Sequence, residues 1–303
     1  MLVSIAISLI LISIIIYGIY YLIIERKESA MSIEERHLRA HWKELKKRGY
    51  KVIALMLQGS QNYGLAEYSL DYCSDIDSKA IVVPTFRDFL NCTPPVSTTV
   101  KFENGEQCDV KDIRVMFECF RKQNLSYLEL LFTKWKIVDW RYKKLLKPLW
   151  EERDAIAAIN RKALANSLAG ITMEKRKALC HPYPSLIEKI QKYGYDGKQL
   201  SHAVRLCLLM KAWRNRTPLE KCFWPSDEER QMLMNYKKQL DIEGQPLDVE
   251  RAIVICDEMV RETGKMKACY GIAWEDPRGI EILEKVKYNV MKKKFRRDIW
   301  RLK

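Results

Sequence analysis

The sequence predicts an α+β protein in which a small mixed β-sheet core is followed by a helical module, with an N-terminal transmembrane helix ahead of both. Three observations support this: an uncharged apolar segment at 2–24, short apolar runs at 51–58 and 78–84, and a helical periodicity that dominates from 141 onward. Short apolar runs are typical of buried strands, whereas apolar side chains spaced three and four apart indicate helices. We therefore predict three parts: an anchor with its flank over 1–30, an α+β domain over 31–140, and a helical domain with a basic C-terminal tail over 141–303.

The first element is the predicted membrane anchor. Residues 2–24 carry no charge, and as a helix they would be about 35 Å long, more than the roughly 30 Å of a bilayer's hydrocarbon core. Arg26, Lys27 and further basic residues follow, so the positive-inside rule predicts a single-pass membrane protein with the remaining chain in the cytoplasm. Met31 opens a second natural-looking start, and if the first thirty residues are a misassigned start, the protein is cytoplasmic.

The next elements are a helix and two strands. Residues 32–48 read as a basic amphipathic helix with Ser32 as N-cap and Glu35 in a capping box. The apolar runs 51–58 and 78–84 follow as buried strands.

A hairpin and a series of helices complete the chain. Asn104-Gly105 lies between two alternating runs within 98–113, and this dipeptide predicts a tight hairpin because both turn positions favour positive φ. Helical patterns then follow over 114–132, 155–179, 185–193, 198–214, 226–240, 248–263 and 279–301.

Charge and cysteine content narrow the classes of partner and site. The 53 Lys and Arg exceed the 39 Asp and Glu, and the net charge of +14 suits an anionic partner such as nucleic acid, nucleotide or an acidic lipid surface. The nine cysteines form no C-x-x-C pair, which argues against a zinc ribbon and favours reduced core residues in a cytosolic compartment.

The C-terminal tail concentrates the positive charge. Residues 285–303 contain nine Lys or Arg, a single acid at Asp298, and the interleaved aromatics Phe295 and Trp300. Three interpretations stay open: a grip on nucleic-acid phosphates, adsorption to anionic lipid, or a solvated helical tail.

Two closely spaced carboxylates suggest a metal site. Asp75 and Asp77 are two apart at the start of the second strand, so their side chains share one face and repel unless a cation lies between them. Magnesium suits such oxygen ligands, with manganese as an alternative. Asp109, on the return strand of the hairpin, is the candidate third carboxylate of a two-metal site, whereas Asp112 would face the other side of that strand.

A turn at the end of the first strand suggests a phosphate site. Gly59 lets the backbone approach a ligand closely, and Ser60 offers a hydroxyl and an amide to phosphate oxygens. A nucleoside triphosphate held there would share its oxygens with the metals.

These residues carry a family resemblance. Gly59-Ser60, Asp75-Ile76-Asp77 and Asp109 resemble the signature of the DNA polymerase β-like nucleotidyltransferase superfamily. In that family the Gly-Ser turn binds nucleotide phosphate and three carboxylates hold two magnesium ions. The resemblance implies a magnesium-dependent enzyme that transfers a nucleoside monophosphate from a triphosphate such as ATP to a hydroxyl of an RNA end, a protein or a nucleotide.

The likeness extends over roughly residues 50–215. Tyr-Gly-Leu after the Gly-Ser turn, the segment 108–132 with its Leu-Glu-Leu-Leu, and the helix at 195–206 resemble predicted bacterial and phage nucleotidyltransferases, some of them RNA-ligase-associated. By this resemblance Lys198, His202 and Arg205 would line the nucleotide cleft; an ordinary charged helix face is the alternative.

Three further positions have two interpretations each. Lys79 would touch phosphate or lie on the surface, and Tyr63 would stack on a base or pack in the core. His37 and His41 have the i, i+4 spacing of metal ligands, but no acidic third ligand stands out, so we favour a solvated helix over a zinc site.

Two functions of other classes compete with the enzyme. One is a non-catalytic, membrane-tethered protein that binds or senses nucleotide; the other is an RNA-binding protein driven by the basic tail, whose binding would depend on salt and not on magnesium.

Overall fold

The computed structural model describes residues 31–68, 74–184, 186–271 and 275–301. Its centre is a five-stranded mixed sheet in the order β3-β4-β2-β1-β5. β2 pairs antiparallel with β1 and parallel with β4, so the predicted α+β class with a mixed sheet is confirmed. The strands are β1 Val52–Gln58, β2 Asp77–Val82, β3 Ser97–Lys101, β4 Gln107–Asp112 and β5 Lys136–Val138.

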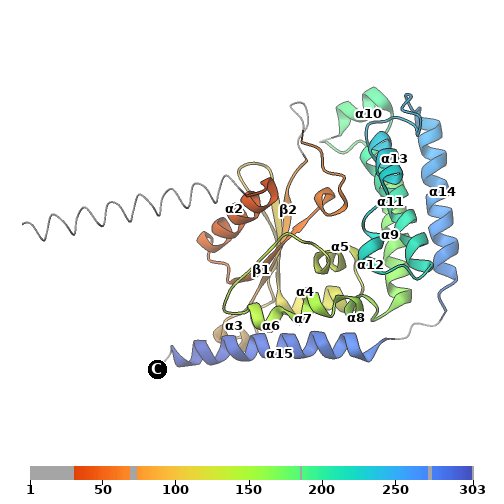
Figure 1. Ribbon diagram of the computed structural model, residues 1–303. Helices are drawn as coiled ribbons and strands as arrows, with labels where there is room; N and C mark the ends of the chain where they lie inside the picture. Colours follow the sequence, from red (N-terminus) through yellow and green to blue (C-terminus); the bar gives the residue numbers. More distant parts are fainter. Residues whose placement is uncertain (1–30, 69–73, 185, 272–274, 302–303) are drawn as a thin grey trace, which may run out of the picture.

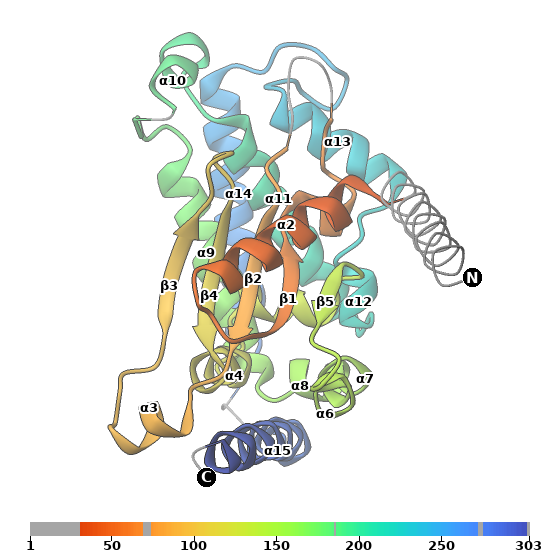
Figure 2. The ribbon, with the colours of Figure 1, turned by 90° about the vertical axis from the view of Figure 1, so that its left-hand side faces the viewer.

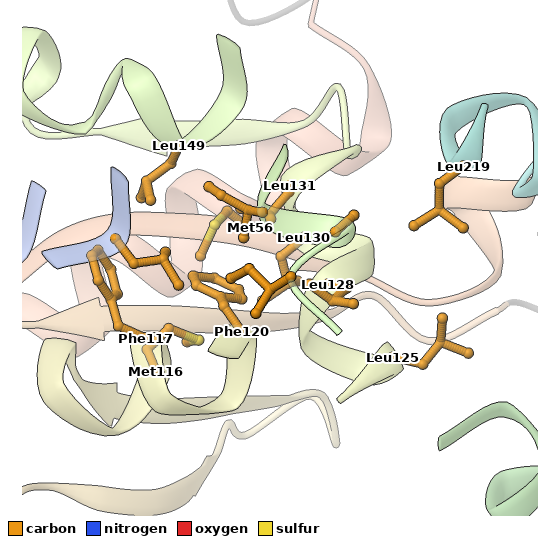
Figure 3. Close-up of a cluster of buried hydrophobic side chains, with 14 of the residues drawn as sticks. Met56, Met116, Phe117, Phe120, Leu125, Leu128, Leu130, Leu131, Leu149 and Leu219 are labelled. Atoms are coloured by element: carbon orange, nitrogen blue, oxygen red, sulfur yellow. The ribbon is translucent and has the colours of Figure 1, made fainter. Parts of the chain in front are cut away.

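Both faces of the sheet are covered, which explains why β1 reads as a continuous apolar run. Helix α2 (Ile33–Lys47) packs on one face through Leu38 and Leu45, and Ser32 caps it by accepting from the Glu35 amide at 3.3 Å. The other face carries α4 (Ile113–Arg121), and Figure 3 shows its aromatic side chains gathered with Met56 of β1.

The predicted hairpin forms with a different turn. Only Gly105 of the Asn104-Gly105 pair has a positive φ, +86°. The Phe102 amide donates to the Glu106 carbonyl at 2.9 Å, and the Gly105 amide donates to the Phe102 carbonyl at 3.1 Å. This is a turn closed by a glycine in the left-handed region, a common alternative to the two-residue loop.

The helix predicted over 114–132 is broken into three pieces. After α4 the chain turns at Gln123, whose φ is +55°. Asn124 then caps α5 (Leu125–Leu128) by accepting from the Ser126 amide, and the short helix η2 (Glu129–Leu131) follows.

The C-terminal half is helical, as predicted. Figure 1 shows α9, α11, α13 and α14 side by side as a bundle. At Gly197 a Cβ atom would lie only 2.3 Å from the Tyr236 carbonyl oxygen, so glycine permits the close approach of α11 and α13. The helices are α9 Arg161–Ala178, α10 Ile187–Tyr193, α11 Gly197–Arg214, α12 Leu219–Cys222, α13 Asp227–Lys237 and α14 Val249–Ala268.

The last helix returns to the sheet domain. α15 (Pro277–Trp300) lies beneath α4 and a group of short helices in Figures 1 and 2. Its Leu283, Val286 and Val290 join the same buried cluster as Ile53 of β1, so residues within the predicted helical domain 141–303 pack against the sheet domain. The short helices are α3 Phe86–Leu90, α6 Lys143–Leu146, α7 Pro148–Glu151 and α8 Arg153–Ala157.

The predicted membrane architecture is corrected. The anchor at residues 2–24 lies outside the described residues, and within the described ranges no helix is both long and apolar enough to cross a bilayer. Even the longest of these, α15, carries charged side chains along most of its length. The predictions of a transmembrane helix and of a single-pass localisation are therefore contradicted.

Candidate functional site

A cleft of about 410 Å³ lies where the sheet domain meets the helical bundle. Its walls are formed by the C-terminal end of β1, the start of β2, η2, and parts of α9, α11 and α13. The sequence-predicted residues that line it are Gly59, Ser60, Tyr63, Asp75, Asp77, Lys198, His202 and Arg205.

The turn after β1 depends on glycine. Gly59 has φ +124° and ψ −168°, a conformation that side-chain-bearing residues rarely adopt. Ser60 then opens a short helix through Tyr63. The side-chain Nε2 of Gln61 donates to the Asp75 backbone carbonyl at 2.9 Å. This bond connects the turn to the segment that carries the carboxylates.

Strand pairing brings the carboxylates to this turn. Asp77 is the register partner of Gln58, the residue before Gly59. Ile76 is only 1% exposed and packs in the core under α2, so Asp75 and Asp77 on either side of it both reach the cleft. The predicted sharing of one face is what the structure shows.

The surroundings of Asp77 disfavour the charged form of its carboxylate. Burial raises its pKa above the ordinary value, and the neighbouring Asp75 raises it further; the Gln107 amide, which donates to Asp77 Oδ1 at 3.1 Å, acts in the opposite direction. A half-buried carboxylate beside a second one is an environment that favours a cation.

Asp109 lies in an adjoining cavity of about 360 Å³ that Gln58 and Asp77 also line. Parallel pairing places Asp109 opposite Lys79 rather than opposite Asp77. Its carboxylate accepts from the Tyr127 hydroxyl at 2.7 Å and lies 3.4 Å from the Lys111 Nζ and 3.9 Å from the Lys79 Nζ.

The three predicted metal ligands are thus distributed over two cavities that share Gln58 and Asp77 as lining residues. Within the described parts of the chain, no three His, Cys, Asp or Glu side chains are grouped closely enough to hold a metal ion. Asp112 is buried and bound to Arg114, on the opposite side of β4 from Asp109, as the alternation of the strand predicts.

The cleft wall opposite the carboxylates is cationic. Lys198, His202 and Arg205 of α11 are joined there by Lys175 of α9 and Lys237 of α13. Burial, followed by the charges of these neighbours, holds the pKa of His202 well below 6.5, and burial also lowers the pKa of Lys175 and Lys237. Glu174 of α9 also lines this wall, so among the described residues four Lys or Arg side chains stand against one acid and leave a net positive charge that suits an anion.

Arg205, Glu129 and Tyr63 form a buried triad in which Arg205 keeps unpaired hydrogen-bond donors. Its Nη2 lies 3.4 Å from Glu129 Oε1, and its guanidinium lies 3.7 Å from the centre of the Tyr63 ring. The Tyr63 hydroxyl donates to Glu129 Oε2 at 2.5 Å. Arg205 is only 6% exposed, yet its Nε and Nη1 have no hydrogen-bond partner among the described residues. A buried guanidinium with two unused nitrogens is suited to bind an oxyanion.

Tyr63 and Lys79 are both buried side chains. Tyr63 is 4% exposed, with Arg205 over its ring. Lys79 is buried, with its Nζ 3.6 Å from the centre of the Tyr127 ring, so the surface interpretation of Lys79 is wrong.

The histidine pair of α2 has a structural role next to the site. His41 is 2% exposed, which contradicts a solvated position, and its ring nitrogens contact Ser78 Oγ at 2.9 Å and Glu106 Oε2 at 2.8 Å. Glu106 also interacts with His37 and accepts from the Ile76 amide at 3.3 Å. The network supports the backbone between the two carboxylates from behind.

Sequence reasoning missed four charged residues of the cleft. Glu174, Lys175 and Lys237 stand in ordinary charged helical patterns that carry no local signal. Glu129 falls in the Leu-Glu-Leu-Leu segment, where an acid among apolar residues indicated a buried partner.

Comparison with known proteins leaves the family open. No protein-family model and no curated protein matches the chain. Among solved structures, the chain is similar to a nucleotidyltransferase-like protein from Exiguobacterium sibiricum 255-15, with 13% identity, a TM-score of 0.27 and 77% of each chain covered. A likeness at this level carries no argument about activity, so the case for function depends on the cleft itself.

Proposed function

We propose that this protein is a nucleotidyltransferase that transfers a nucleoside monophosphate from a nucleoside triphosphate to a hydroxyl acceptor. The observation that carries the proposal is the presence of both kinds of charge in one cleft: Asp75 and Asp77 line it next to the Gly59-Ser60 turn, and the described part of the bundle side contributes four Lys or Arg side chains against one acid, Glu174. A metal-bound triphosphate needs both kinds of charge at once.

The donor set fits magnesium. Asp75 and Asp77 present hard oxygen ligands, and the pKa of Asp77 is raised first by burial and then by the neighbouring Asp75, an environment that a bound cation would relieve. Asp109 is the third candidate ligand, from the adjoining cavity that Asp77 shares. Bound there, magnesium would neutralise phosphate charge and favour ionisation of the acceptor hydroxyl.

The chain's own residues would bind and orient the triphosphate. Ser60 offers its hydroxyl and amide, Lys198 and Lys175 supply positive charge, and the two unpartnered nitrogens of Arg205 donate to phosphate oxygens. In the transfer, the acceptor oxygen forms a bond to the α-phosphorus, the bond from that phosphorus to the β-phosphate bridge breaks, and pyrophosphate leaves. Asp109 is the proposed recipient of the acceptor's proton.

Transfer of label tests the proposal. The protein is incubated with each α-labelled nucleoside triphosphate, magnesium, and either cellular RNA or protein; label should enter one acceptor class. Asp77→Asn should reduce incorporation at least 100-fold. Asp154→Asn, on an exposed position of α8 outside both cavities, is the matched control and should leave it unchanged.

Two other outcomes would reject the enzyme. Nucleotide binding without incorporation, equal in wild type and Asp77→Asn, would indicate a sensor. RNA binding that depends on salt but on neither magnesium nor Asp77 would indicate an RNA-binding protein.

A further inference from the structure

A second cationic cavity lies at the opposite end of β1 from the cleft. It has a volume of about 290 Å³ and is formed by the end of α2, the start of β1, the segment after β5, and the last turns of α15. Gly59 follows the last residue of β1, whereas Lys51 precedes the first, so the seven residues of the strand, roughly 23 Å, separate the two sites. Its charged lining residues are Lys46, Lys51, Arg141, Lys294, Arg297 and Arg301.

The positive charge of this cavity is only partly balanced. Arg141 pairs with Asp139 at 2.5 Å, and Lys294 pairs with Asp298. Within the described ranges, the other four basic residues of the lining have no carboxylate partner, and the Nε of Arg297 is a buried donor with no hydrogen-bond partner.

The cavity wall is held in place by packing. Asp298 accepts from the Phe86 amide at 3.0 Å, which joins α15 to the start of α3. Phe295 of α15 packs against Phe86 and Phe89, with ring centres 5.5 and 5.2 Å apart. Lys293 donates to the Arg141 carbonyl oxygen. The basic side chains are therefore gathered by the fold before any ligand arrives.

We infer that this cavity binds the phosphate group of a small phosphorylated anion. Several cations that converge without matching acids bind a multiply charged oxyanion better than a carboxylate. A concave site of this size suits a small molecule, whereas a nucleic-acid strand would need a longer groove and a membrane a broad surface. The site lies outside the proposed nucleotide cleft, and it gives the basic end of the chain a specific role.

Lysine footprinting with inorganic pyrophosphate tests this inference at the residues concerned. Lysines of the full chain are acetylated at constant ionic strength with increasing pyrophosphate, and modification is quantified by mass spectrometry. Lys46 and Lys51 line the cavity, whereas Lys47, adjacent to Lys46, is 81% exposed and lies outside it. We expect acetylation of Lys46 and Lys51 to slow at least fivefold, with Lys47 unchanged.

Paired variants separate specific binding from general charge. Arg297→Gln with Arg301→Gln should raise the pyrophosphate concentration needed for half-maximal protection at least tenfold. Lys292→Gln with Arg296→Gln removes the same charge from exposed positions of α15 and should not. Equal melting temperatures verify folding, and Lys51→Gln, at an exposed position, replaces the pair if it is destabilised.

Three results would overturn the inference: no protection at millimolar pyrophosphate, equal loss of protection in both variant pairs, or protection by an RNA oligonucleotide or anionic vesicles alone. Because the readout involves neither nucleotide transfer nor residues of the first cleft, its failure leaves the proposed nucleotidyltransferase activity untouched.

Discussion

Lys79 and Asp109 are direct neighbours across the parallel pairing of β2 and β4, with 3.9 Å between the lysine Nζ and the carboxylate. The Tyr127 hydroxyl binds the same carboxylate, and its ring lies under the Lys79 Nζ. With the Lys111 Nζ, 3.4 Å from the same carboxylate, Lys79 supplies positive charge that a metal cation at Asp109 would otherwise supply. In the proposed enzyme, metal binding at Asp109 competes with this lysine.

We therefore expect Lys79→Gln to lower the magnesium concentration needed for half-maximal binding by about three- to tenfold, measured by calorimetry with a non-hydrolysable triphosphate present. Removal of an ion-pair partner worth about 1 kcal/mol produces a change of this order. Lys101→Gln, an exposed position on β3, is the control. Weaker magnesium binding in Lys79→Gln would show that Lys79 assists the metal or the phosphate.

The Gly59 turn predicts a position-specific effect of alanine. Gly59→Ala forces a side chain onto φ +124° and brings its Cβ within 3.0 Å of Gln61 Oε1, so it should cost about 1–3 kcal/mol of unfolding free energy. Because Gln61 holds the Asp75 backbone, nucleotide transfer should fall more than stability does. Gly49→Ala, also at positive φ but with open space around it, should lose stability and keep its activity. Equal activity losses in both variants would remove the special role of the turn.

The buried triad predicts a stability cost for a single oxygen atom. Tyr63→Phe removes the hydroxyl that donates to Glu129 and leaves a buried carboxylate with one partner fewer, so urea unfolding should show a loss of about 1–3 kcal/mol. Tyr68→Phe, at an exposed position, should lose less than about 0.5 kcal/mol. A similar small loss in Tyr63→Phe would mean that the Tyr63–Glu129 bond contributes little.

Acid should destabilise the fold through His41 and the partly buried His202. The pKa of His202 is held well below 6.5 by burial and nearby cations, and burial lowers that of His41. The unfolded chain, whose histidines keep ordinary pKa values, therefore binds more protons below about pH 6.5, and stability falls with pH in that window. Urea unfolding at pH 7.5, 6.5 and 5.5 should show this loss, and His202→Gln should reduce it, with exposed His181→Gln as control. An unchanged pH dependence in His202→Gln would contradict the assignment.

Strand alternation and turn chemistry, which are local properties of the sequence, were sufficient to predict the part of the site around Gly59, Asp75 and Asp77. Alternation along the extended segment that leads into β2 turns Ile76 into the core and Asp75 and Asp77 to the cleft, and antiparallel pairing with β1 then brings Asp77 to Gln58 and the Gly59 turn. Strand period and turn chemistry are readable from sequence. The helix predicted over 198–214 is also present, as α11; that Lys198, His202 and Arg205 line a cleft was implied by the family resemblance and not by local rules.

The pairing register between strands distant in the chain could not be predicted from the sequence. Asp109 was predicted to join the other two carboxylates, but β4 pairs in parallel with β2 and sets Asp109 opposite Lys79; nothing local in the hairpin specifies that register. The partner of His41, Glu106, is 65 residues away. Likewise, the periodicity of α15 shows that one face is buried without showing that it packs beneath the sheet domain.

The most direct test of the account is the effect of magnesium on thermal unfolding of wild type and Asp77→Asn. Without metal, Asp77→Asn should be more stable, by on the order of 1 kcal/mol, because it removes a half-buried charge beside Asp75. Magnesium at about 100 times its dissociation constant should then stabilise the wild type by about 2.7 kcal/mol and leave Asp77→Asn unchanged. An equal magnesium shift in both proteins would show that Asp75 and Asp77 do not hold the metal.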